Sequence, residues 1–315
     1  LPEPSPGSGE VLIAPRAWSI NYRDFLVASG KYMGGALVKP GIPLCDGAGE
    51  VVAVGDGVTR FRPGDRVQST FFVDWLDGPP RQVPALGDGH TPGLLAEKVV
   101  LPQNAVIPMA RTLDFAEAAC LPCAGVTAWN ALCEGPRPIK PGERVLVLGT
   151  GGVSMLALQI ARVSGAEVIA TSSSDEKLDR VRALGAAHTI NYRKVPDWGA
   201  HVLSEFGGVH KVIEVGGPGT AQQSMAALAM EGEVAIIGVL SPEGGANPRG
   251  LMLNAGIMRG IFVGSAAMAQ RLNAAVDANG IKPVIGARFG FEQAKEAYAH
   301  AWGPESFAKT VIELD

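Results

Sequence analysis

A glycine-rich turn joins an apolar run to a helical pattern near the middle of the chain. Residues 144–148 have the length of a buried strand, and 153–165 carry apolar side chains at helical spacing. Glycine lets the backbone turn sharply and approach a phosphate, and free N–H groups at a helix start bind anions. We therefore predict a dinucleotide-binding turn, although Ser154 replaces the third glycine of G-x-G-x-x-G and a purely structural turn has the same pattern. The predicted contacts are Gly149, Gly151, Gly152 and Val153.

The next apolar run, 166–171, ends in hydroxyl-bearing residues and not in an acid. An acid at this tip would bind the ribose 2′-hydroxyl of NAD and would repel the 2′-phosphate of NADP. Ser172, Ser173 and Lys177 could instead donate hydrogen bonds to that phosphate, so we expect NADP and regard NAD as the less favoured cofactor. Ser173 and Glu176 also have the spacing of a helix capping box, which is compatible with an anion site.

The elements that position these residues form two patterns. In the first third of the chain, short strands alternate with Gly/Pro turns, as in a small β-barrel, and we expect strands at 49–58, 61–69 and 93–102. From about residue 124, apolar strands alternate with helices, which predicts a doubly wound parallel sheet of six strands. The sixth strand is expected at 259–265. The fold class is therefore α/β.

Composition excludes several kinds of partner. The 315 residues include 47% hydrophobic and 18% charged residues, enough apolar material for two domains. The net charge is −4 and basic residues form no block, so we expect neither a nucleic acid nor a membrane as partner. Four cysteines form no disulfide framework, which favours a reducing, cytoplasmic location. The first residue is Leu1, so we expect the natural chain to begin earlier.

Four motifs occur in order along the chain: INYRDFLVASGKY (20–32), PGDRV (63–67), LPCAGVTAWNAL (121–132) and GTGGVS (149–154). They resemble motifs of the medium-chain dehydrogenase/reductase superfamily, in particular of its quinone oxidoreductase-like and alcohol dehydrogenase-like members. The resemblance implies a GroES-like catalytic domain at 1–123, a Rossmann domain at 124–265 and a return to the catalytic domain at 266–315. It also implies a cleft that holds the nicotinamide, and a homodimer formed through Rossmann edge strands.

The resemblance also bears on zinc. Zinc-dependent members bind the metal through Cys, His and Cys, and these positions fall on Asn21, Cys45 and Cys123. An asparagine amide is a poor zinc ligand, so we expect no metal. We interpret Cys120 and Cys123 as small buried core residues.

Without a metal, hydrogen-bond donors must stabilise the negative charge that develops on a substrate oxygen. The resemblance places Asn21 and Tyr32 in the catalytic cleft, with Tyr32 as a proton donor or else an exposed loop tyrosine. Arg23 and Asp24 are expected to form a local salt bridge, and Asp46 to have a structural role.

The remaining predicted cofactor contacts lie at strand ends or match positions of the family, although ordinary turn chemistry could explain the strand ends. Lys309 matches a cofactor-facing lysine, but Ala308 replaces the glycine that usually precedes it. The set is Thr127, Tyr192, Val215, Gly216, Gly238, Val239, Val263, Gly264, Ser265 and Lys309.

These features predict a zinc-independent, NADP(H)-dependent oxidoreductase. It would transfer hydride between the nicotinamide and a small-molecule carbonyl, quinone or enone. The alternatives are a zinc-dependent alcohol dehydrogenase with atypical ligands and an NADPH-binding protein without catalysis.

Overall fold

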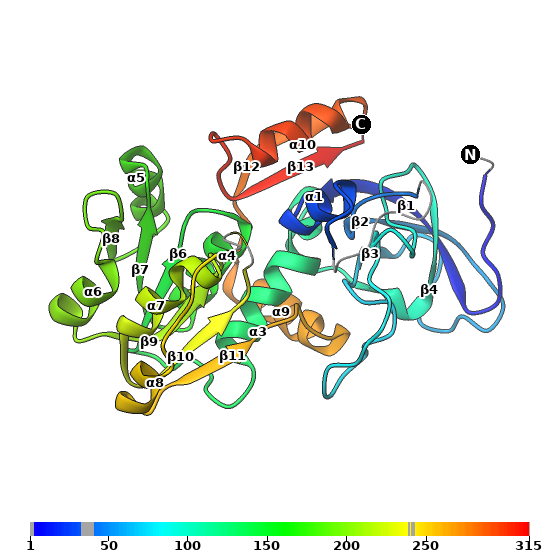
Figure 1. Ribbon diagram of the computed structural model, residues 1–315. Helices are drawn as coiled ribbons and strands as arrows, with labels where there is room; N and C mark the ends of the chain where they lie inside the picture. Colours follow the sequence, from blue (N-terminus) through cyan, green and yellow to red (C-terminus); the bar gives the residue numbers. More distant parts are fainter. Residues whose placement is uncertain (1–2, 33–40, 239, 241–242, 315) are drawn as a thin grey trace. The chain divides into compact units, whose positions relative to one another are not determined.

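The computed structural model describes residues 3–32, 41–238, 240 and 243–314. The chain forms two compact units, one of Leu1–Val126 with Val263–Asp315 and one of Thr127–Phe262 (Figure 1). Helix α3 (Val126–Cys133) carries the chain from the first unit into the second. None of the helices in the described part of the chain is long and apolar enough to cross a bilayer.

The second unit is a parallel six-stranded sheet in the order β11-β10-β9-β6-β7-β8. In chain order this is 3-2-1-4-5-6, the Rossmann arrangement, so the predicted doubly wound fold is confirmed. The strands are β6 (Arg144–Leu148), β7 (Glu167–Ser172), β8 (His188–Asn191), β9 (Val209–Glu214), β10 (Leu228–Ile236) and β11 (Ile257–Gly260). The helices are α4 (Gly152–Val163), α5 (Asp175–Ala183), α6 (Trp198–Phe206), α7 (Pro218–Ala226) and α8 (Arg249–Leu253).

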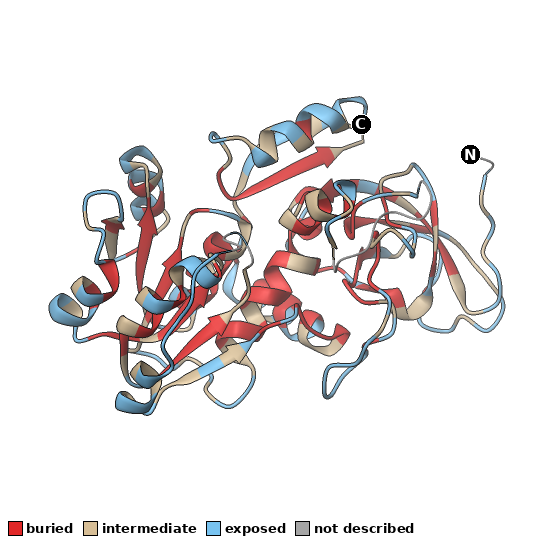
Figure 2. Cartoon of the chain, viewed as in Figure 1, coloured by how far each residue is buried: buried red, intermediate tan, exposed pale blue. Residues whose placement is uncertain are grey.

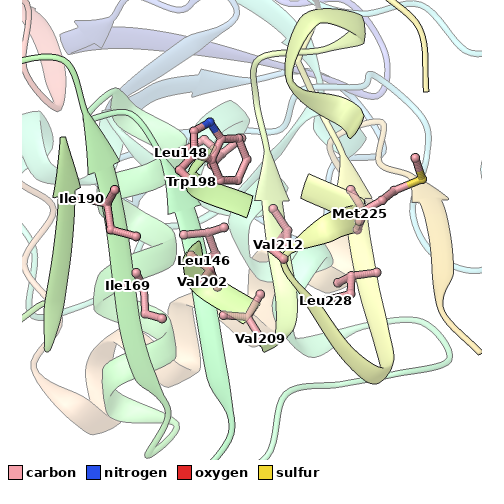
Figure 3. Close-up of a cluster of buried hydrophobic side chains, with 12 residues drawn as sticks. Leu146, Leu148, Ile169, Ile190, Trp198, Val202, Val209, Val212, Met225 and Leu228 are labelled. Atoms are coloured by element: carbon pink, nitrogen blue, oxygen red, sulfur yellow. The ribbon is translucent and has the colours of Figure 1, made fainter. Parts of the chain in front are cut away.

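The strands of this unit are apolar on both sides, because helices cover both faces of a parallel sheet. Leu146, Ile169 and Val212 belong to a buried cluster that also takes side chains from α6 and α7 (Figure 3). The central strands are buried along most of their length, whereas α5 and α6 expose their outer faces (Figure 2). The strand order reverses between β6 and β9, where an open α/β sheet binds its ligand.

The first unit is built on a seven-stranded sheet in the order β12-β13-β1-β2-β3-β5, with β4 paired to β1. Its strands are β1 (Glu10–Ser19), β2 (Asp46–Val54), β3 (Arg66–Ser69), β4 (Val99–Pro102), β5 (Val106–Pro108), β12 (Ile285–Gly290) and β13 (Lys309–Glu313). Its helices are α1 (Tyr22–Ala28), α2 (Phe115–Ala119), α9 (Ala266–Asn279) and α10 (Ala294–Trp302), with short 3-10 turns at Gln103–Ala105 and Phe291–Gln293 and a π-helical turn, η3, at Leu121–Gly125.

Two chain-distant pairings position the residues of this unit. Strand β1 pairs antiparallel with β2, which sets Ser19 opposite Asp46. On its other side β1 pairs with β13, which sets Ser19 opposite Val311 and brings the C-terminal strand to the start of α1. Residues near 20, 46 and 309 therefore come together despite their separation in sequence.

Two predicted strands have different bounds in the structure. The strand predicted at 93–102 is only β4, because the N–H groups of Gly93 and Leu94 bond to carbonyls of the loop at Ile42 and Leu44. The strand predicted at 259–265 is β11, which ends at Gly260, and Val263 has a φ of 50° that an extended strand cannot contain.

Candidate functional site

The glycine turn between β6 and α4 presents bare backbone. Gly149 has a φ of 70°, in the left-handed region that favours glycine. Gly151 is the N-cap of α4 and has no side chain with which to cap the first N–H groups of the helix. A Cβ built on either glycine would meet no atom of the described residues within 4 Å. The turn can therefore receive an anion at the N-terminus of the helix.

Ser154, at the third position of the glycine pattern, ties the helix to the strand. Its side chain is buried, and its hydroxyl donates to the carbonyl oxygen of Leu148 at 2.6 Å. The substitution therefore keeps α4 close to the end of β6 through a hydrogen bond, where glycine would allow close contact through its small size.

The tip of β7 is lined with hydroxyl groups, as predicted. Thr171 Oγ1 accepts from the N–H of Gly149 at 3.4 Å, which links the tip to the glycine turn. Ser172 is buried, and its Oγ accepts from the N–H of Ser174, which leaves its O–H as a donor. The predicted capping box is wrong by one residue: Ser174 caps α5, by accepting from the N–H of Lys177.

Asp175, the acid that follows the tip of β7, points toward β8 and the connection after β8. The Asp175 carboxylate accepts from Asn191 Nδ2 at 2.8 Å and from Lys194 Nζ at 2.7 Å, and these contacts lower its pKa. Tyr192 is 41% exposed, and its N–H donates to the carbonyl oxygen of Ser172. The tip therefore combines serine hydroxyls with a neighbouring tyrosine, and a lysine offsets the charge of the closest carboxylate.

A buried acid that the sequence prediction missed shapes the turn after β9. Glu214 accepts from the N–H groups of Gly216 and Gly217, at 2.7 and 2.9 Å, and from the hydroxyls of Thr220 and Ser224. An acid at the end of an otherwise apolar strand, directly before a Val-Gly-Gly turn, is the signal that could have identified it.

The predicted contacts at the ends of β9 and β10 pack closely on each other. A Cβ on Gly238 would lie 1.5 Å from the carbonyl oxygen of Val215, and one on Gly216 would lie 2.3 Å from the Thr220 hydroxyl. These glycines therefore have a packing reason of their own. Val239 lies outside the described residues.

Val263, Gly264 and Ser265 follow β11 by a few residues and belong to the first unit. Ser265 is buried and caps α9 by accepting from the N–H of Met268 at 3.2 Å. Thr127 is buried in α3, at the start of the second unit. The structure gives these positions structural roles, and their cofactor contacts stay predictions.

In the first unit, the start of α1, the start of β2, the turn η3 and the start of β13 bring a polar cluster together. The sulfur atoms of Cys45 and Cys123 and a carboxylate oxygen of Asp46 lie within 4.8 Å of one another. Cys123 is only half-buried, so the prediction that it is a core residue is wrong. Cys120 is fully buried, as predicted, and burial raises the pKa of its thiol to about 12. Cys123 differs because η3 directs it toward β2.

Asn21 connects this cluster through both ends of its amide. Its Nδ2 donates to Asp46 Oδ2 at 2.8 Å and lies 3.7 Å from Cys45 Sγ. Its Oδ1 accepts from Lys309 Nζ at 2.7 Å, so the predicted cofactor-facing lysine ends here. The amide of Asn21 is therefore engaged in the protein and acts first as a connector.

In zinc-dependent members of the superfamily that the motifs resemble, the metal lies at the positions of Asn21, Cys45 and Cys123. Three potential ligands are present, from Cys45, Asp46 and Cys123. However, the Cys45 thiol donates to Asp46 Oδ1 at 3.2 Å, so a bound zinc ion would have to displace this proton and break this hydrogen bond. Lys309 Nζ also lies 3.7 Å from Asp46 Oδ2. A neighbouring ammonium and a carboxylate that is already hydrogen-bonded make a poor environment for a dication.

Next to this cluster, Arg23 lies between two aromatic rings. Its guanidinium carbon is 4.8 Å from the ring centre of Tyr32 and 4.9 Å from that of Phe71, which is cation–π geometry. Its Nη1 donates to Leu86 O and lies 3.5 Å from Asp24 Oδ1, so the predicted local salt bridge is confirmed. Tyr32 is partly buried, and burial raises its pKa, which keeps the phenol protonated.

A Rossmann sheet with a bare glycine turn, joined to a second β-rich unit that carries a buried polar cluster, defines a nicotinamide-dependent dehydrogenase or reductase. Residues 7–111 match the model of the alcohol dehydrogenase GroES-like domain, and residues 152–278 match that of zinc-binding dehydrogenases.

Similar proteins with names are also dehydrogenases or reductases. A zinc-type alcohol dehydrogenase-like protein of Schizosaccharomyces pombe is 45% identical over 98% of this chain and 91% of its own. The quinone oxidoreductase of Rattus norvegicus is 30% identical over 94% and 86%, and the chloroplastic NADPH-dependent alkenal/one oxidoreductase of Arabidopsis thaliana is 28% identical over 96% and 72%. A solved NAD-dependent alcohol dehydrogenase is 32% identical with a TM-score of 0.86, covering 100% of this chain and 94% of that one.

The chain belongs to the medium-chain dehydrogenase/reductase superfamily, with the predicted GroES-like and Rossmann folds. It is an oxidoreductase of this family that uses a nicotinamide cofactor. The similar proteins include both NAD-dependent and NADPH-dependent members, so the residues of this chain have to decide which cofactor it prefers.

Proposed function

We propose that this chain is a zinc-independent, NADP(H)-dependent oxidoreductase that transfers hydride between the nicotinamide and a carbonyl, quinone or enone substrate. The main support for NADP(H) is the tip of β7, where Ser172 is the last residue of the strand and Asp175 is paired with Lys194. A 2′-phosphate needs donors and the absence of a facing carboxylate, and this tip provides both. Ser172, Ser173, Lys177 and Tyr192 are the proposed contacts.

When bound, the nicotinamide supplies the hydride. The pyrophosphate would be held by the N–H groups of Gly151, Gly152 and Val153, and Gly149 would let the backbone approach it closely. Reduction leaves negative charge on the substrate oxygen, which needs a proton or a donor. Tyr32 can donate its phenolic proton, and the guanidinium of Arg23 would stabilise the phenolate that remains. Asn21 would hold the neighbouring cluster in place.

Turnover tests this proposal. Purified protein with NADPH is expected to reduce at least one member of a panel of quinones, enones and aldehydes. Tyr32→Phe should lower kcat by about 100-fold or more, because it removes a proton donor, and should leave the Kd for NADPH unchanged. NADPH binding without turnover on any substrate would favour the non-catalytic alternative.

One observation favours a second candidate, a zinc-dependent alcohol dehydrogenase with atypical ligands. Cys45, Asp46 and Cys123 converge closely enough to hold an ion. Metal analysis of the purified protein separates the two candidates. One tightly held zinc per chain that supports activity would establish the second and contradict the first.

The proposed enzyme is a homodimer. Strand β11 ends its sheet, and Met258 on it is 40% exposed, which leaves an apolar edge that a second copy could extend. Light scattering should give twice the chain mass, and a Met258→Lys variant should shift the protein to monomers.

The cysteines Cys45, Cys120, Cys123 and Cys133 are all free, which supports a reducing, cytoplasmic location.

A further inference from the structure

The ammonium group of Lys309 is buried in the polar cluster of the first unit. The side chain is 3% exposed, and its Nζ donates to the carbonyl oxygen of Ile20 at 2.9 Å and to Asn21 Oδ1 at 2.7 Å. It also lies 3.7 Å from Asp46 Oδ2, and that carboxylate is fully buried. A cation is therefore already built into this cluster, beside the one carboxylate that a metal would use.

The hydrogen bonds around Asp46 are arranged for a protein cation and not for a metal. Oδ2 accepts from Asn21 Nδ2 at 2.8 Å and lies 3.1 Å from the hydroxyl of Ser19. Oδ1 accepts from the thiol of Cys45 at 3.2 Å. Both carboxylate oxygens thus have partners, and the thiol proton that a metal would displace completes the set. A divalent ion would have to break these bonds and lie a few ångströms from the ammonium.

We propose that Lys309 replaces a metal ion: its ammonium balances the buried Asp46 and excludes divalent cations from the site formed by Cys45, Asp46 and Cys123. This inference rests on the proposed zinc-independent function and gives its physical reason. Removing the positive charge while keeping the aliphatic side chain should convert the site into one that binds metal.

Cobalt titration tests this directly, because Co²⁺ bound to thiolates gives a charge-transfer absorption that needs no turnover. Chelator-treated wild-type protein and a Lys309→Arg control, which keeps the cation, should show no saturable thiolate band. Lys309→Met should bind about one Co²⁺ per chain, at least about tenfold more tightly than any binding by the wild type, because the repulsion from the ammonium is gone. The double variant K309M/C123S should lose that binding, because one ligand is gone.

Folding of the variant is part of the test. K309M leaves Asp46 without its cation, so the chain could require the metal in order to fold. Folding only when Co²⁺ is present supports the proposal, because the ion then takes the place of the ammonium. If K309M stays unfolded with Co²⁺ while K309M/D46N folds, the ion cannot replace the lysine and the proposal is wrong.

Two further results would overturn it: a stoichiometric Co²⁺–thiolate band in the wild-type protein, or a folded K309M that binds Co²⁺ no better than the wild type. NADPH titrations of the same wild-type sample keep the claims separate. If the wild-type protein does not bind NADPH, the proposed function is contradicted, whereas the cobalt results are unaffected.

Discussion

The Nζ of Lys309 and the Oδ1 of Asn21 lie 2.7 Å apart, although 288 residues separate them in the chain. Strands β13 and β1 pair side by side and bring the two residues together. The same asparagine donates to Asp46 through its Nδ2. Asn21 therefore bridges a buried cation and a buried anion, and the stability of the first unit should depend on it.

Removing this bridge should destabilise the protein. Asn21→Ala removes one hydrogen bond from each of two buried charged groups, Lys309 and Asp46, and a hydrogen bond to a charged group contributes about 1.5–3 kcal/mol. We expect the free energy of unfolding to fall by about 3 kcal/mol, measured by urea denaturation. Asn279 is exposed at the end of α9, so Asn279→Ala should stay within about 0.5 kcal/mol of the wild type. Equal losses in both variants would argue against the bridge.

The buried carboxyl of Asp24 should make stability depend on pH. Burial raises its pKa to about 6, although Arg23 and the N–H of Asn21 act to lower it. An acid whose folded pKa is raised binds more protons in the folded state, so its contribution increases as pH falls from about 6 to about 4 and is lost as pH rises through 6.

Asp24→Asn isolates this effect, because the amide oxygen can still accept from Asn21. Between pH 4 and pH 7, the difference in unfolding free energy between wild type and variant should change by an amount on the order of 3 kcal/mol, in favour of the wild type at low pH. Parallel stability curves for the two proteins would show that Asp24 titrates normally.

The glycine turn gives a variant that separates folding from binding. Gly151 has a φ of −78°, which alanine adopts readily, and its added Cβ would meet no described atom within 4 Å. Gly151→Ala should therefore fold normally but place a methyl group where the pyrophosphate approaches. We expect the melting temperature to change little and the Kd for NADPH to rise at least about tenfold, or about 1.4 kcal/mol. Unchanged affinity would place the dinucleotide elsewhere.

The residue before Lys309 is held in a conformation that suits glycine. Ala308 has a φ of 55°, which costs an L-residue about 1–2 kcal/mol. Ala308→Gly should remove this strain, although glycine also increases the entropy of the unfolded chain, which offsets part of the gain. The net effect should be a rise in the free energy of unfolding of about 0.5–1 kcal/mol. Ala287 lies on the neighbouring strand β12, and Ala287→Gly should lower it by about 0.5–1 kcal/mol. Opposite signs in this matched pair are the expected outcome.

Local pattern predicted the second unit well and the polar cluster poorly. Apolar runs such as 144–148 are continuous in sequence, and a parallel sheet buries each one whole, so the Rossmann sheet and its glycine turn could be recognised. The N-cap at Ser174 was missed by one residue, because several adjacent serines can all serve as caps. The contact of Lys309 with Asn21 depends on strand pairing between the two ends of the chain, which no local pattern contains.

The same reason explains Cys123 and Glu214. From the sequence, Cys123 lies in an apolar run, and only the turn η3 shows that it faces Cys45 and Asp46. Glu214 ends an apolar strand, and its partners lie in the helix that follows the turn. The sequence shows that a polar group stands at such a junction, but its partners are recognised only when the backbone around it is known.

The cofactor preference is the central claim, and parallel titrations with NADPH and NADH test it most directly. Wild-type protein should bind NADPH at least about tenfold more tightly than NADH, equal to about 1.4 kcal/mol. Ser172→Asp should reverse this order, because a carboxylate at the tip of β7 accepts from a ribose hydroxyl and repels a phosphate, whereas Ser204→Asp on the exposed face of α6 should not. Tighter binding of NADH by the wild-type protein, or an unchanged preference in Ser172→Asp, would contradict the account.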